Sequence, residues 1–403
     1  MLYRELLTGE LDKQRDDFRR FAETQASDLA NYLKDLERVN QSPYEEICRR
    51  LAGKDVGAMP SDEITKLKSF AVRFTENWAN HEEARVWANK ILQNRTTFAA
   101  DGSQLYVEKD VSLPIGAIQI GWFENPHDAT QSYEKNAYFQ ILSPETLLQK
   151  QEEPVIPETR VGEIRFHAEI KKISEFLHKK RDWQRNGEKM PLAFFDNTLL
   201  FTLSLSSTII EKSFLQATFE MIKLSRETEV PVVGYVDASY SKDLINMLNT
   251  LYGASGSGQK SLYDSIILSS PNADSPKILE SWGDRTCFCF SKRQGLSQFL
   301  EEVPGESLVG FTYLQTTREA APARLDIPSW IYEKGFLNEL LDVVRAECVI
   351  GLGYPYALET ADQTAVITMR DREIFLRALQ DFAQREKLNF NVSRKAASKG
   401  RRR

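Results

Sequence analysis

Short apolar segments alternate with longer amphipathic segments along most of this chain, from about residue 96 onward. Runs at 113–124, 191–204 and 230–236 are rich in β-branched and aromatic residues, which is typical of strands. Between them, the apolar residues of 161–182 recur at steps of three and four, which indicates a helix. Strands that alternate with helices in this way predict an α/β domain, in which a mixed sheet is covered by helices.

The two ends of the chain differ from this pattern. Leucine and phenylalanine residues recur at helical spacing between charges from the N-terminus onward, so we expect a helical arm or cap over residues 1–92. The α/β domain then occupies residues 93–388. The last segment, 389–403, contains SRKAASKGRRR, which is basic and poor in apolar residues, and we expect it to be a disordered tail.

Composition excludes several classes of protein. The chain has 403 residues, of which 41% are hydrophobic, and its net charge is −6. No apolar run approaches the roughly 18 residues that a membrane span needs, and the N-terminus has acids where a signal peptide is basic, so we expect a cytoplasmic protein. The four cysteines are scattered, and none of the four histidines lies in a nucleophile–base or HExxH arrangement. This argues against zinc sites and serine or cysteine hydrolases, and favours carboxylate and metal chemistry.

Isolated aspartates follow or interrupt the apolar runs. Burial of a lone carboxylate costs several kcal/mol unless it is paired or bound to a metal, and hard ions such as Mg²⁺ and Mn²⁺ prefer oxygen ligands. Several such aspartates in one domain therefore predict a shared acidic site, although each one alone is more typical of a turn or an ion pair. The aspartates are Asp101, Asp196, Asp237 and Asp326.

Asp101 stands in TTFAADGSQLYVEKD, residues 96–110. Because Asp-Gly is a favoured hairpin turn, we expect Gly102 to bend the chain and to leave Asp101 at the end of a strand, with its carboxylate free for an ion.

Further candidates lie on predicted helices. Glu163 and Glu169 lie on helix 161–182, and Glu169 follows Arg165 by one turn, so a surface ion pair is the alternative to a site role. Gly-Tyr-Pro-Tyr at 353–356 predicts a turn, in which Tyr354 is either a packed aromatic or a phenol near a phosphate. Asp362 follows within the first turns of the next helix.

The order of these blocks resembles the NurA nuclease family over about residues 60 to 385. The resemblance rests on four motifs in the same order. They are Asp101-Gly102-Ser103, Asp196-Asn197-Thr198-Leu199, Arg324-Leu325-Asp326-Ile327-Pro328, and Gly353 to Ala361 with Tyr354.

The resemblance implies an RNase H-like (Piwi-like) mixed sheet flanked by helices and a nuclease dependent on Mn²⁺ or Mg²⁺. It implies action on single-stranded DNA and on 5′ ends during double-strand-break end resection, as a homodimer with a HerA-type hexameric ATPase. Carried over by position, the metal ligands are Asp101, Glu169 (or Glu163), Asp196 and Asp362, with Tyr354 as a further catalytic residue. We also expect Arg324 and Asp326 to bind substrate.

The chain departs from the family pattern in places. Asp362 stands where many members have histidine, Asn197 follows Asp196 where glycine is usual, and GYVDAS lacks a lysine that many members carry. Two alternatives therefore stay open, a catalytically weak interaction subunit of a DNA-translocating ATPase and an RNase H-like enzyme acting on RNA. The basic segment 178–185, with Trp183 available to stack on a base, either holds a DNA strand or is a solvated helix end.

Overall fold

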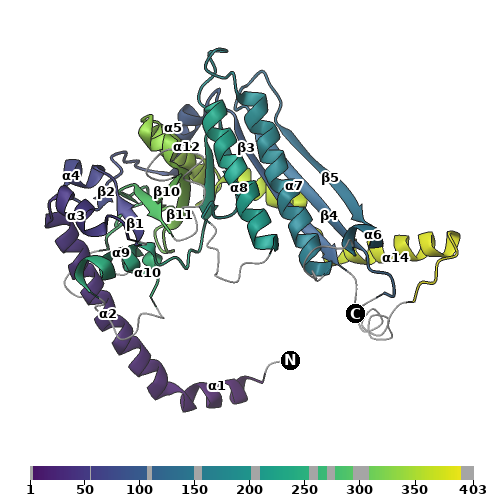
Figure 1. Ribbon diagram of the computed structural model, residues 1–403, viewed down its shortest axis with the longest axis horizontal. Helices are drawn as coiled ribbons and strands as arrows, with labels where there is room; N and C mark the ends of the chain where they lie inside the picture. The colour runs from purple at the N-terminus through teal and green to yellow at the C-terminus, as the bar shows by residue number, and fades with distance from the viewer. Residues whose placement is uncertain are drawn as a thin grey trace. The chain divides into compact units, whose positions relative to one another are not determined.

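The computed structural model describes residues 3–54, 56–106, 111–148, 157–200, 209–253, 262–269, 277–293 and 308–391. The chain divides into two compact units (Figure 1). The first unit comprises Met1–Asn77 and Tyr235–Tyr332, and the second comprises Trp78–Gly234 and Glu333–Arg403. The N-terminal segment is therefore part of a unit with residues far along the chain, whereas the sequence predicts a separate arm over 1–92. The predicted tail lies outside the described residues from 392 onward.

The second unit contains a mixed sheet with the strand order β7-β6-β3-β4-β5. Strands β3, β4 and β5 are antiparallel neighbours, whereas β6 is parallel to both β3 and β7. The strands are β3 (Thr97–Tyr106), β4 (Gly116–Asn125), β5 (Glu134–Leu142), β6 (Leu192–Phe195) and β7 (Val232–Val236), the last of which crosses the boundary between the units.

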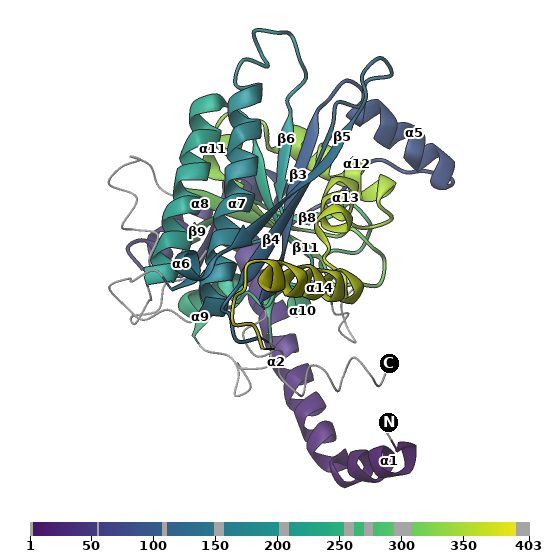
Figure 2. The same ribbon diagram turned by 90° about the vertical axis from the view of Figure 1, so that its right-hand side faces the viewer.

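Helices cover both faces of this sheet. Figure 2 shows α7 and α8 on one side of β3 and β4, and α13 on the other. Every residue of β6 is buried, as expected for a parallel strand covered on both faces. The helices of the unit are α5 (His81–Leu92), α6 (Pro144–Leu147), α7 (Pro157–Lys180), α8 (Ile209–Thr228), α12 (Leu337–Ile350), α13 (Tyr356–Ala365) and α14 (Met369–Arg385). This arrangement confirms the predicted α/β class.

The first unit combines the N-terminal helices with an antiparallel sheet. Its strand order is β1-β9-β10-β11, and β8 pairs with both β10 and β2. Residues 1–92 are thus not helical throughout, because β1 and β2 lie among them. The elements are α1 (Arg4–Lys13), α2 (Arg15–Gln41), α3 (Tyr44–Leu51), β1 (Gly57–Pro60), α4 (Glu63–Leu67), β2 (Ala71–Val72), α9 (Asp243–Tyr252), α10 (Asp264–Ser269), β8 (Arg285–Thr286), β9 (Cys289–Lys292), β10 (Val309–Leu314), β11 (Ala323–Pro328) and α11 (Ser329–Glu333).

The helices and the cysteines relate to the classes of protein that composition excludes. Within the described ranges, no helix combines the length and the apolar character that a membrane span requires. The cysteines are free thiols, and Cys287, Cys289 and Cys348 are buried.

Candidate active site

Asp101 lies within a continuous strand and not at a turn. Strand β3 pairs with β4 along its whole length, with Asp101 opposite Gly121 and Gly102 opposite Ile120. The expected hairpin turn at Asp101-Gly102 is therefore wrong. Gly102 serves close packing instead, because a Cβ added there would clash with the Glu169 carboxylate and lie 2.8 Å from Cγ of Arg165.

Asp101 and Asp196 are placed side by side by the strand register. Ala100 of β3 is paired with Phe195, the last residue of the parallel strand β6. Asp101 and Asp196 directly follow these two residues in the chain, so both lie at the carboxyl end of β6. The Tyr354 hydroxyl donates a hydrogen bond to Oδ1 of Asp196 at 2.9 Å, which brings the tyrosine of the Gly-Tyr-Pro-Tyr turn to the same place.

Glu169 reaches the cluster from α7. The residue is 5% exposed, and its side chain forms an ion pair with Nη1 of Arg165, so the predicted pair exists but is largely buried. The Arg165 guanidinium also donates hydrogen bonds to the Gly102 carbonyl and to Oε1 of Gln104, both at 3.1 Å. The alternative ligand Glu163 pairs with Arg160 and accepts a hydrogen bond from Ser213 instead. The structure thus brings Glu169, and not Glu163, to Asp101.

Asp362 approaches from α13 on the opposite face of the sheet. The helix packs directly on β4 at Gly121, where an added Cβ would lie 2.6 Å from the Ala365 nitrogen and 2.9 Å from the Ala361 oxygen. The Asp362 side chain is exposed, and its charge acts on Asp101. An isolated glycine inside a strand pattern indicates a close approach of another backbone, so Gly121 is the signal by which the sequence could have located this helix.

The carboxylates perturb one another. Burial raises the pKa of Asp101 to about 6, and the nearby charges of Asp196 and Asp362 contribute in the same direction. Burial likewise raises the pKa of Glu169 to about 8, partly offset by Arg165 and reinforced by Asp101 and Asp196. Crowded acids with raised pKa values are typical of functional sites.

The donor set fits a hard divalent cation. Asp101, Glu169, Asp196 and Asp362 offer oxygen atoms, which are the ligands that Mg²⁺ and Mn²⁺ prefer. Two of them are exposed and two are at least half-buried, so the cluster opens to solvent on one side. Within the described residues no three such side chains already surround a common point, and Glu169 is engaged by Arg165.

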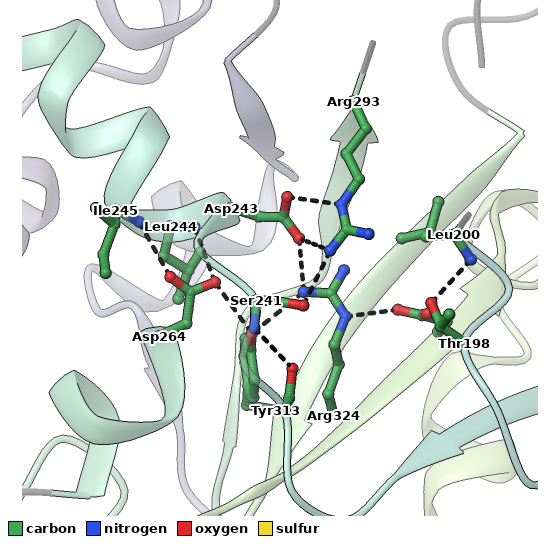
Figure 3. A network of polar contacts seen from close by, with 12 residues as sticks. Thr198, Leu200, Ser241, Asp243, Leu244, Ile245, Asp264, Arg293, Tyr313 and Arg324 are labelled. Carbon is green, nitrogen blue, oxygen red and sulfur yellow. Dashed lines mark hydrogen bonds and ion pairs between the residues drawn. The ribbon is translucent and has the colours of Figure 1, made fainter. Parts of the chain in front are cut away.

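Arg324 and Asp326 occupy a different place, the core of the first unit. They are 1% and 0% exposed, and Nε of Arg324 lies 2.7 Å from Oδ1 of Asp326. Figure 3 shows Asp243 facing both Arg324 and Arg293. Oδ2 of Asp243 lies 2.6 Å from Nη1 of Arg324 and 2.7 Å from Nη2 of Arg293. This burial gives no support to a direct role in substrate binding, which stays a prediction.

Two further candidates lie away from the cluster. Asp237 directly follows β7 and belongs to the first unit. Trp183 is 7% exposed and donates a hydrogen bond to the Glu229 carbonyl at 3.0 Å. The indole is therefore not available to stack on a base, and this part of the prediction for segment 178–185 is wrong.

Comparisons with known proteins agree with the architecture. The model of the NurA domain matches residues 95–367. Among solved structures, the NurA nuclease from Sulfolobus solfataricus is similar with a TM-score of 0.51 and 11% identity, over 96% of this chain and 98% of that one. This similarity confirms the expected mixed sheet flanked by helices.

Two other solved structures are similar to this chain at lower scores. The catalytic domain of human endonuclease V matches with a TM-score of 0.33 and 15% identity, over 79% of this chain and 95% of that one. A NurA structure with manganese matches with a TM-score of 0.32 and 12% identity, over 76% and 93%. No curated protein matches the sequence.

Proposed function

The chain belongs to the NurA family, whose domain model matches residues 95–367, and we propose from this that it is a divalent-metal-dependent nuclease that hydrolyses DNA. The observation that carries the proposal is the acidic cluster inside the matched region. Asp101 and Glu169 have raised pKa values because they are buried beside other carboxylates, and a shared cation would relieve that repulsion.

Asp101, Glu169, Asp196 and Asp362 are the residues that would hold Mn²⁺ or Mg²⁺. When bound in such a site, divalent ions activate a water molecule and neutralise charge on the phosphodiester and its leaving oxygen. The exposure of Asp196 and Asp362 leaves room for a polymer to reach the cluster.

Tyr354 and Arg165 orient the carboxylates of the site and offset part of their charge. The Tyr354 hydroxyl donates to Asp196 and so fixes the orientation of that carboxylate. Arg165 is tied to Glu169, to the Gly102 carbonyl and to Gln104. It therefore offsets part of the negative charge and holds α7 against β3.

The finer parts of the proposal rest on family membership. They are cleavage of single-stranded DNA and of duplex 5′ ends, a role in double-strand-break end resection, assembly as a homodimer and partnership with a HerA-type hexameric ATPase.

Cleavage of end-labelled single-stranded DNA tests the activity. We expect products with Mn²⁺, none with EDTA, and loss of at least a hundredfold in rate for Asp101→Asn, whereas Asp381→Asn on the exposed face of α14 cleaves as the wild type does. Equal cleavage by Asp101→Asn, or cleavage that persists in EDTA, contradicts the proposal. If the folded wild-type protein does not cleave the DNA, the interaction-subunit alternative is favoured. If it cleaves an RNA of the same sequence faster than the DNA, the alternative of an enzyme that acts on RNA is favoured.

A further inference from the structure

Glu347 of α12 is a carboxylate buried at the meeting point of separate chain segments. It is 1% exposed. Its Oε1 accepts a hydrogen bond from the Thr97 hydroxyl at 2.8 Å, and its Oε2 accepts one from the Ala357 amide at 2.9 Å. Burial of a carboxylate is costly unless its oxygens are satisfied, and here both oxygens have partners.

The two partners begin the elements that carry the acidic cluster. Thr97 is the first residue of β3, the strand of Asp101. Ala357 lies in the first turn of α13, the helix of Asp362, directly after the turn that contains Tyr354. One carboxylate therefore joins the start of β3 to the start of α13.

The helix end depends on this contact. The first amides of a helix lack partners within the helix, and the residue at the N-cap position of α13 is Pro355, which makes no side-chain cap hydrogen bond. Glu347 reaches these amides from another helix, and its negative charge suits the positive end of the α13 dipole.

His127, in the connection between β4 and β5, completes the arrangement. Its Nε2 lies 3.6 Å from Oε1 of Glu347, and its Nδ1 lies 2.7 Å from the Arg95 carbonyl. Because a carbonyl can only accept, Nδ1 carries a hydrogen. The backbone of His127 has φ +47°, a left-handed conformation that a non-glycine residue keeps only where its surroundings hold it.

We propose that Glu347 is a positioning residue for the acidic cluster, which holds the start of α13 against the start of β3 and thereby fixes Asp362 and Tyr354 relative to Asp101. This inference rests on the proposed function, since it concerns the geometry of that site. Displacement of reacting groups by about 1 Å can cost roughly a hundredfold in rate, so a loosened α13 would act on turnover more than on DNA binding.

The variants Glu347→Ala, Glu347→Gln and Thr97→Val test the proposal. Glu339→Gln is the matched control, because Glu339 lies on the same helix and pairs with Arg95 at 2.7 Å but makes neither contact. Hydrogen–deuterium exchange of the peptide 353–365 reports how firmly α13 is held, without any metal. Steady-state cleavage of single-stranded DNA with Mn²⁺ reports kcat and KM separately.

For Glu347→Ala we expect faster exchange in 353–365 and a kcat roughly a hundredfold lower, with KM within about twofold of the wild type. Glu347→Gln keeps an oxygen for the Ala357 amide and should recover much of both losses. Thr97→Val removes only the hydrogen bond between β3 and Glu347. Its exchange rate in 353–365 and its kcat should therefore lie between those of Glu347→Ala and those of the wild type. Glu339→Gln should match the wild type.

Either of two results would overturn the inference. The first is unchanged exchange of 353–365 in Glu347→Ala. The second is a change in exchange and in kcat in Glu339→Gln as large as that in Glu347→Ala. Failure of the wild type to cleave is a separate outcome. If exchange still quickens in Glu347→Ala, that outcome contradicts the proposed nuclease and supports the tie between α13 and β3.

Discussion

Asp101 and Gly121 are opposite residues on neighbouring antiparallel strands, and the bare Cα of Gly121 allows α13 to reach the sheet beside Asp101. A side chain at Gly121 would meet the backbone of α13 at Ala361 and Ala365. Asp362 lies on the helix between these two contact points. The geometry of the cluster therefore depends on a glycine that carries no functional group of its own.

Replacement of this glycine should damage both stability and activity. In Gly121→Ala the new methyl group would lie 2.6 Å from the Ala365 nitrogen, so α13 must shift. We expect a loss of ~1–3 kcal/mol in the free energy of unfolding, as for other overpacked sites, together with reduced cleavage. Urea unfolding and single-stranded DNA cleavage measure the two effects.

Gly162→Ala is the control for this substitution. Gly162 lies within helix α7, and its added Cβ would have its nearest neighbour, Gln104, at 3.6 Å. Alanine is preferred to glycine inside a helix, so we expect a gain of ~0.5–1 kcal/mol. A Gly121→Ala protein as stable and active as the wild type would show that α13 does not need this close approach.

The metal-free protein should lose stability as the pH rises. The pKa of Glu169 is raised by burial to about 8 from an ordinary value of 4.5, so between these values the folded chain retains a proton that the unfolded chain has lost. The free energy of unfolding therefore falls across this interval. We expect Glu169→Gln in EDTA to match the wild type near pH 4 and to exceed it at pH 8.5 by more than ~1.4 kcal/mol, the equivalent of one pKa unit.

Denaturant unfolding at a series of pH values measures this difference. Glu175→Gln, an exposed substitution on the same helix, should follow the wild-type profile. A wild type whose stability stays level from pH 5 to 8.5, or a Glu169→Gln profile parallel to it, would contradict the prediction.

The sequence was sufficient to predict the fold class and the acidic residues. Alternating strand and helix patterns reflect local side-chain periodicity, which the structure keeps in β4, β6, β7 and α7. Asp196 could be recognised because a charged residue directly follows the fully buried apolar run of β6.

Features that depend on contacts between distant segments could not be predicted. Asp-Gly resembles a turn in isolation, and pairing with β4 makes it part of a strand. Glu169 has the spacing of a surface ion pair with Arg165, and burial under the sheet becomes evident only from the packing of α7 on β3. The assembly of residues 1–77 with 235–332 likewise has no local signature.

Binding of Mn²⁺ should release protons. The pKa of Asp101 is raised by burial to about 6 and that of Glu169 to about 8, so near neutral pH the cluster holds protons that metal ligands must lose. We expect the affinity for Mn²⁺ to rise from pH 6 to pH 8. At one pH, calorimetric titrations in two buffers of different ionisation enthalpy should give different heats. Equal heats in both buffers would mean that the carboxylates are already ionised.

Removal of the Tyr354 hydroxyl should separate activity from stability. The hydroxyl donates to Asp196 at 2.9 Å in an exposed position, where the loss of one hydrogen bond changes the free energy of unfolding by no more than ~0.5 kcal/mol. Cleavage should fall more strongly, because Asp196 loses the group that orients it. Tyr356→Phe, two residues away in a ring contact with Phe123, is the control and should keep wild-type kcat. If Tyr354→Phe cleaves as fast as Tyr356→Phe, the phenol has no part in the reaction, and its contact with Asp196 is incidental to the site.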